Sequence, residues 1–268
     1  GQLLLVRFGM QAVLLLPWVV LGRRPWRLTA RQWWLMALRS LLHLAAIAMM
    51  FAALRQLPLA ETVAIVFVMP FLLLVLGRVF LKERVGASQL GACLLGFGGT
   101  LLIVQPGMTM AGAAAILPLM VALCFALFML LTRSLAQSAD PIALQALSAL
   151  LATPLVGLWL VLAPLWAPHS PAPAWGALSP QTALLLLGIG VLGTVAHLLV
   201  TYALRFAPSA DLAPLQYLEI PVAAVLGLWI FGDWPNAMAQ LGIAISVSAG
   251  LFVMLRARAR PGRAQPAP

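Results

Sequence analysis

Charged side chains are scarce in this sequence. They make up 8% of the 268 residues, against about 25% in an ordinary soluble domain. Hydrophobic residues make up 63%, against roughly 45–50% in soluble proteins. A soluble globule could not cover so much apolar surface, and a disordered chain has the opposite composition. The composition therefore excludes both classes and leaves a polytopic membrane protein.

The residues and motifs of several kinds of site are also missing. The two cysteines, Cys93 and Cys124, lie inside apolar runs, so a disulfide scaffold is excluded. The sequence contains no His-Glu-x-x-His, Cys-x-x-Cys, Gly-x-Ser-x-Gly or phosphate-binding loop. We therefore expect no enzyme, no bound metal and no cofactor. Two alternatives stay open, namely a polytopic membrane enzyme such as a lipid transferase and a passive channel.

The apolar residues form continuous runs, which predict helices rather than the alternating strands of an outer-membrane barrel. A helix needs about 20 apolar residues to cross a bilayer. Nine runs approach this length, and they leave no soluble domain. The predicted spans are 3–21, 32–54, 59–80, 88–104, 112–131, 141–163, 181–204, 212–231 and 237–255. We thus predict an all-α, polytopic membrane helix bundle.

The placement of the basic residues predicts how the chain is oriented. If nine helices alternate in direction, the odd-numbered gaps and the C-terminal tail over 257–268 share one side, and they hold nearly all arginines and lysines of the gaps. Among the even-numbered gaps only the second is basic, through Arg55. This positive-inside pattern puts the tail in the cytoplasm and residue 1 outside, in an inner membrane of the bacterial type. We expect the tail to meet anionic lipid headgroups, and nothing resembles a nucleic-acid surface.

An internal repeat indicates how the helices are organised. The motif Ala-Leu-Arg at 53–55 recurs 150 residues later at 203–205, and prolines and acidic residues downstream of it recur at nearly the same offset. The acidic corner at Glu83 falls on the arginine-rich side of the membrane, whereas its counterpart Asp233 falls on the other side. The two copies are therefore predicted to have inverted topology.

We divide the chain into a first repeat over 1–107, with four helices, and a second over 108–256, with five. Inverted repeats of this kind build alternating-access transporters, in which the substrate binds near the midplane at the repeat interface.

Several motifs then resemble one family. They are Arg39-Ser40, Ala53-Leu54-Arg55-x-x-Pro58-Leu59-Ala60, Leu81-x-Glu83-Arg84, Gly96-x-Gly98-Gly99, Tyr217-x-Glu219-x-Pro221 and Phe231-Gly232-Asp233-x-Pro235. Together they look like the EamA-type drug/metabolite transporters, and within them like members that take up S-adenosylmethionine or riboflavin. The resemblance implies a secondary active transporter of a small organic metabolite. It also implies ten helices, so the family's first helix would precede residue 1.

Polar residues inside the predicted spans form the candidate site, because a charge in hydrocarbon is costly and usually functional. Counted from the flanking charges, Arg39, His197 and Glu219 lie at one level, about 12 Å from the cytoplasmic face. We expect them to line a common cavity for the substrate or a coupling ion. A structural role in helix packing is the alternative reading. The other predicted cavity residues are His43, Pro70, Gln216, Tyr217 and Pro221.

Small residues recur every four positions on one helix of each repeat. Such spacing lets helix backbones approach closely. We expect these residues to pack inside the bundle, with a homodimer face as the alternative. They are Ala92, Gly96 and Thr100 in the first repeat, and Gly242, Ser246 and Gly250 in the second.

The predicted orientation can be tested by cysteine labelling in intact cells. A membrane-impermeant maleimide should label His169→Cys from outside. It should label Arg260→Cys only after the cells are opened, because the arginine-rich side faces the cytoplasm. Labelling of Arg260→Cys in sealed cells would contradict this topology.

Overall fold

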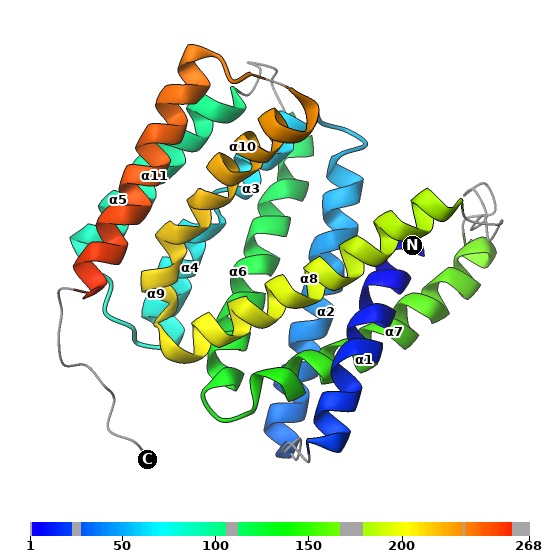
Figure 1. Cartoon of the computed structure of the whole chain (residues 1–268). Helices are drawn as coiled ribbons and strands as arrows, with labels where there is room; N and C mark the ends of the chain where they lie inside the picture. Colours follow the sequence, from blue (N-terminus) through cyan, green and yellow to red (C-terminus); the bar gives the residue numbers. More distant parts are fainter. Residues whose placement is uncertain (1, 23–27, 106–111, 167–178, 233, 259–268) are drawn as a thin grey trace. The chain divides into compact units, whose positions relative to one another are not determined.

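The structure, a computed structural model, describes residues 2–22, 28–105, 112–166, 179–232 and 234–258. Within these residues nine segments are helical, long and apolar enough to cross a membrane, and none forms a strand (Figure 1). The predicted all-α membrane bundle is therefore confirmed. His169 and Asp233, together with the tail from residue 259, lie outside the described residues.

Seven crossings are single helices. They are α1 (Gln2–Leu21), α2 (Ala30–Ala53), α5 (Ala87–Val104), α6 (Ile116–Ala136, preceded by the 3₁₀ turn η1, Gly112–Ala115), α7 (Pro141–Trp166), α8 (Pro180–Phe206) and α11 (Ala237–Arg258). The other two crossings are interrupted. One consists of α3 (Leu59–Val66) and α4 (Met69–Phe80), and the other of α9 (Ser209–Leu212), the 3₁₀ segment η2 (Ala213–Leu218) and α10 (Glu219–Phe231).

One predicted boundary differs from the structure by a full helical turn. The span predicted to end at residue 131 continues as α6 to Ala136. The prediction stopped because Arg133 is charged. In the structure Arg133 donates to the carbonyl oxygens of Leu204, at 2.6 Å, and Arg205, at 3.0 Å. A cation that satisfies the last carbonyls of a neighbouring helix can remain inside its own helix.

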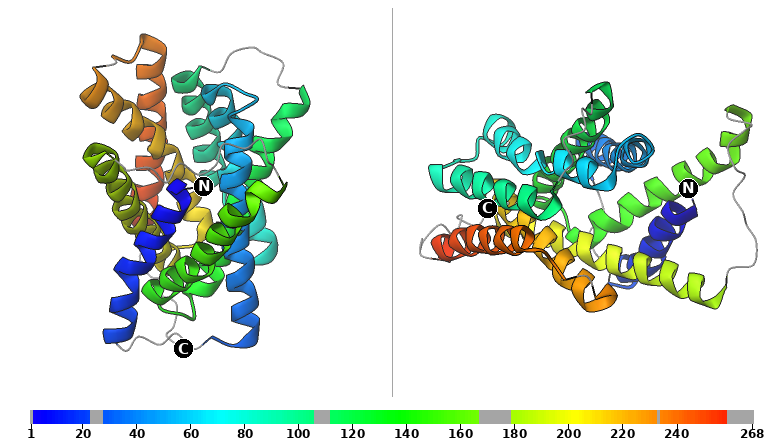
Figure 2. Two further views of the ribbon diagram at one scale, coloured as in Figure 1. Left: turned by 90° about the vertical axis from the view of Figure 1, so that its right-hand side faces the viewer. Right: turned by 90° about the horizontal axis from the view of Figure 1, so that it is seen from above.

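The chain folds into two compact units, and each contains helices from both predicted repeats. Unit 1 comprises residues 1–44 and 131–206, and unit 2 comprises residues 45–130 and 207–268. In unit 1, α1 packs against α7 and α8 (Figure 2). Gly190 allows this approach, because a Cβ atom there would lie 2.8 Å from Cβ of Met10. Leu15, Val19, Ala143 and Ala146 form the buried contact between α1 and α7.

In unit 2, α5 and α11 lie side by side and run antiparallel (Figures 1 and 2). Gln105 at the end of α5 hydrogen-bonds Asn236 just before α11, at 2.8 Å. Further along, Gly99 faces Gly242, where a Cβ on Gly99 would lie 2.8 Å from the Gly242 carbonyl oxygen. At the other end Ala92 packs with residues late in α11, namely Ala249 and Val253. The small-residue stripes thus lie against each other within the chain.

Two contacts in unit 2 join residues that are 150 positions apart, which is the offset of the sequence repeat. The Tyr217 hydroxyl donates to the Phe67 carbonyl oxygen at 3.0 Å, and the Ser246 hydroxyl approaches the Gly96 carbonyl oxygen at 3.5 Å. An inverted repeat is expected to bring residues one repeat apart together near its two-fold axis, and these two contacts agree with that expectation.

The close approach of α5 and α11 gives a matched pair of test variants. Gly99→Leu should lower the free energy of unfolding by about 1–3 kcal/mol, because the added side chain overlaps the α11 backbone. Gly98→Leu is the control, since Gly98 is exposed and a Cβ there meets nothing within 4 Å. Thermal unfolding in detergent measures the difference. Equal stability of the two variants would contradict the α5–α11 interface.

Candidate functional site

The interruption between α3 and α4 follows from Pro70, which lies in the first turn of α4 and is buried. Proline has no backbone N–H and cannot continue the ladder of a helix. The amide N–H of Phe71 donates to the carbonyl oxygen of Val68 at 3.0 Å. In a regular α-helix it would donate to the carbonyl oxygen of Phe67. That freed carbonyl, on Phe67, accepts the Tyr217 hydroxyl. In hydrocarbon such a replacement is required, because no water is present to satisfy the oxygen.

Tyr217 lies in the core of unit 2 with none of its side chain exposed. Its ring lies against Gly96, where a Cβ atom would be 2.5 Å from the ring carbon Cδ2. The rings of Phe67 and Phe97 lie 5.9 and 6.5 Å from it, centroid to centroid. Within its unit Tyr217 therefore fixes the break between α3 and α4.

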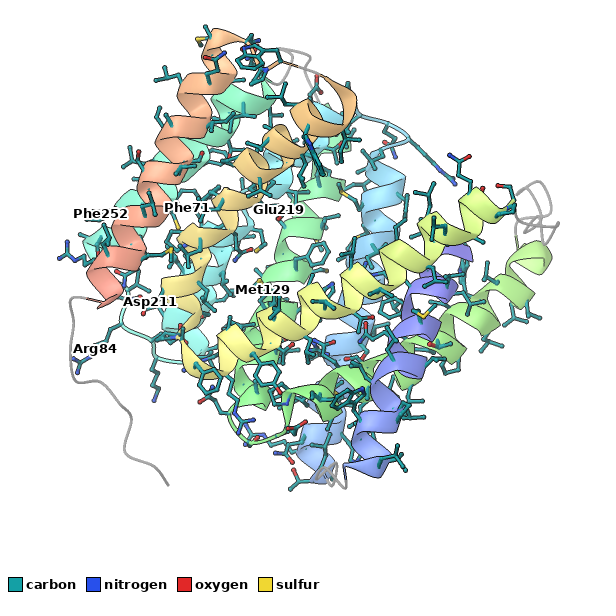
Figure 3. The ribbon with its side chains drawn as sticks, in the orientation of Figure 1. Phe71, Arg84, Met129, Asp211, Glu219 and Phe252 are labelled. Carbon is teal, nitrogen blue, oxygen red and sulfur yellow. The ribbon has the colours of Figure 1, made fainter. Side chains whose placement is uncertain are left out.

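Glu219 and Gln216 occupy the second interrupted crossing. Glu219 is the first residue of α10 and is exposed (Figure 3). A carboxylate at this position complements the positive end of the helix dipole. Pro221 is buried in the same first turn, where its missing N–H costs no hydrogen bond. The Nε2 of Gln216 is buried and has no hydrogen-bond partner among the described residues.

Arg39 lies in the interior of unit 1, with none of its surface exposed. Its Nε donates to Oγ1 of Thr132 at 2.7 Å, and one of its terminal nitrogens donates to Oγ of Ser148. Arg39 therefore joins α2 to α6 and α7 through two uncharged hydroxyls, which favours the packing role among the two readings of the sequence.

Four side chains from three helices of unit 1 form a closed ring of contacts, which we call the Arg7 cluster. Arg7 on α1 hydrogen-bonds Nε2 of His197 on α8. The His197 ring lies 4.9 Å from that of His43 on α2, and the His43 ring meets Phe8 edge-on at 5.5 Å. The ring closes because the Arg7 guanidinium lies 5.8 Å from the centre of the Phe8 ring.

The hydrogen bond to Arg7 defines the state of His197. A guanidinium carries only donors, so Nε2 of His197 must accept and cannot hold a proton. His197 is then neutral, with its proton on Nδ1. A second proton on this ring would break the bond and place two cations in contact.

A network of neutral groups holds the backbone of α8 beside the cluster. The Gln145 side chain donates to Oγ1 of Thr201 and to the carbonyl oxygen of His197, the latter at 3.1 Å. Oγ1 of Thr201 donates to the same carbonyl at 2.8 Å. Gln11 on α1 donates to the Gln145 backbone at 2.7 Å. These bonds tie α1, α7 and α8 together next to His197.

The structure thus brings two of the predicted site residues, His43 and His197, into contact and places Arg39 one helical turn from His43. Glu219 belongs to the other unit, so the cavity that it was predicted to share with them stays a prediction. Arg7 was not identified as a site residue from the sequence. The feature that could have identified it is its charge inside the first apolar run. No three metal-ligating side chains gather among the residues that the structure describes.

The known proteins that resemble this chain in sequence include several transporters. A riboflavin transporter of Rhizobium johnstonii is 34% identical over 76% of this chain, and the match spans 64% of that protein's length. A riboflavin transporter of Vibrio cholerae is 28% identical over 93% of this chain and 80% of the relative. An S-adenosylmethionine uptake transporter of Rickettsia bellii is 24% identical over 92% of this chain and 81% of the relative.

The fold also has a match among solved structures. One crystal structure superposes with a TM-score of 0.79 over 95% of this chain and 88% of the other, at 15% sequence identity, which shows a shared fold. The EamA-like transporter family matches residues 2–105 and 112–255, nearly the whole sequence. The chain therefore belongs to the EamA-like transporter family, as its motifs and its two-part repeat predicted.

Proposed function

We propose that this protein is a secondary active transporter that moves riboflavin, or a closely similar flat metabolite, across the inner membrane. The observation that carries the proposal is that three riboflavin transporters, from Rhizobium, Brucella and Vibrio, match between 76% and 93% of the chain. Because the sequence has no phosphate-binding loop, an ion gradient or a solute gradient would drive transport.

Alternating access between two inverted repeats, 1–107 and 108–256, is the mechanism that we propose. The contacts in unit 2 between residues one repeat apart support it. The C-terminal tail would face the cytoplasm, where its arginines would meet anionic lipid headgroups. The small-residue stripes of α5 and α11 already face each other, which favours a role inside the bundle over a homodimer face.

The charges of unit 1 favour riboflavin over S-adenosylmethionine as substrate. Residues 1–44 and 131–206 contain eight arginines and a single carboxylate, Asp140. Asp140 accepts the amide N–H groups of Ile142 and Ala143 at the start of α7. A sulfonium ion would be repelled by an arginine inside a span, such as Arg7, whereas riboflavin is uncharged and presents carbonyl oxygens to donors.

A substrate panel tests the proposal. Cells that lack their own riboflavin uptake should accumulate riboflavin in a saturable manner when they make this protein. Excess S-adenosylmethionine should not compete, because the riboflavin transporter of Rhizobium is 34% identical to this chain and the S-adenosylmethionine transporter of Rickettsia bellii 24%. Accumulation of S-adenosylmethionine with no uptake of riboflavin would assign the other substrate.

Glu219 is our candidate for a coupling-ion residue, since it is an exposed carboxylate inside a predicted span. Glu219→Gln should abolish uptake driven by a pH gradient and should spare exchange of substrate across the membrane. Glu61→Gln is the matched control, because Glu61 is a buried carboxylate in the first turn of α3. Equal loss of both activities in a folded Glu219→Gln protein would instead indicate a role in substrate binding.

A further inference from the structure

The α8 helix leaves room for Arg7 to reach His197. Gly193 lies one turn before His197, and a Cβ atom on Gly193 would be 3.2 Å from Nε of Arg7. The Arg7 side chain therefore crosses α8 over Gly193 and ends at His197. Gly193 and His197 lie on the same face of α8, because residues four apart on a helix stack. The position of Arg7 therefore depends on the absent side chain of Gly193 and on the acceptor nitrogen of His197.

The Arg7 cluster has a closed side and an open side. Phe8 and His43 are buried, with 1% and 6% of their surfaces exposed, and they support the cluster. Arg7 and His197 are half-buried, so part of each remains accessible. Arg7 is the sixth residue of α1, inside a predicted span, and charged side chains in such segments face the bundle interior or a water-filled path rather than lipid.

We propose that Arg7 binds the substrate through an acceptor-rich edge, and that His197 and Gly193 position it for this purpose. This inference rests on the function proposed above and adds the recognition residue. His197 engages one Nη of the guanidinium, and the remaining N–H groups can donate to a ligand. Planar, charged donors of this kind recognise paired oxygen or nitrogen acceptors in one plane.

The ligand that fits has two adjacent acceptors at the edge of a flat ring, as in the pyrimidinedione edge of a flavin. His197 strengthens the match because it is neutral and adds no charge that would have to be balanced. A carboxylate in its place would neutralise the guanidinium. The cluster therefore favours uncharged or anionic ring systems and disfavours cationic ones.

Variants of Arg7 and Gly193 test the assignment, with the riboflavin KM and Vmax as readout. Arg7→Gln should raise KM about tenfold or more with little change in Vmax, because a charge-assisted hydrogen bond to the bound ring is lost. Gly193→Val should raise KM in the same direction, since the new side chain displaces the guanidinium without changing its charge. Gly188→Val is the matched control, because a Cβ atom at Gly188 meets nothing within 4 Å.

Two variants of His197 separate positioning from folding. The amide oxygen of His197→Gln can accept from Arg7 and should retain most of the riboflavin affinity, whereas His197→Leu should raise KM as Arg7→Gln does. Thermal unfolding in detergent identifies any variant that fails to fold. Wild-type KM in a folded Arg7→Gln protein would overturn the inference and leave the proposed function standing. Wild-type protein that transports no riboflavin would instead refute the function itself.

Discussion

In hydrocarbon every polar group must find its partner inside the protein, and this constraint underlies the structure. The break between α3 and α4 persists because the Tyr217 hydroxyl donates to the Phe67 carbonyl oxygen, which the Phe71 amide leaves free by bonding Val68 instead. Polar groups are matched at the membrane edge as well, because the Glu83 carboxylate accepts the backbone amides of Ser209 and Ala210 at the start of α9, each at 3.0 Å. The same constraint encloses Arg39 between hydroxyls in unit 1. Each of these polar groups is matched by a side chain from another helix or from the turn that follows one.

The need of polar groups for hydrogen-bond partners also bears on function. At a break in a helix some backbone N–H and C=O groups are free to bind a solute, whereas in a continuous helix they bond each other. In transporters such breaks line the substrate path. In unit 2 the broken crossings contact each other, through Tyr217 and Phe67. The carboxylates are concentrated there too, since all but one of the six Asp and Glu residues fall in unit 2. Unit 1 holds the Arg7 cluster instead, so the two units differ in the chemistry that they offer to a solute.

Much of the fold could be predicted from the sequence, because an uninterrupted apolar run of about 20 residues is typical of a membrane-spanning helix and of little else. The site was harder to predict. Counting residues gave the depth of Arg39 and His197, but depth says nothing about which neighbour a side chain meets. Arg39 is enclosed by Thr132 and Ser148, which are ordinary residues in a sequence. Arg7 was missed because the nearest arginine of a gap, Arg23, lies 16 residues away at the other end of the first run, and because its contact with His197 spans 190 positions.

Counterflow in proteoliposomes tests the central claim most directly, namely that the protein is a carrier of riboflavin. Vesicles that contain the purified protein are loaded with unlabelled riboflavin and diluted into a trace of radiolabelled riboflavin, without any ion gradient. A carrier predicts a transient accumulation of label above its equilibrium level, because each binding site that returns inward exchanges one molecule for another. A monotonic rise to equilibrium would indicate a passive channel, and no entry of label would show that riboflavin is not the substrate.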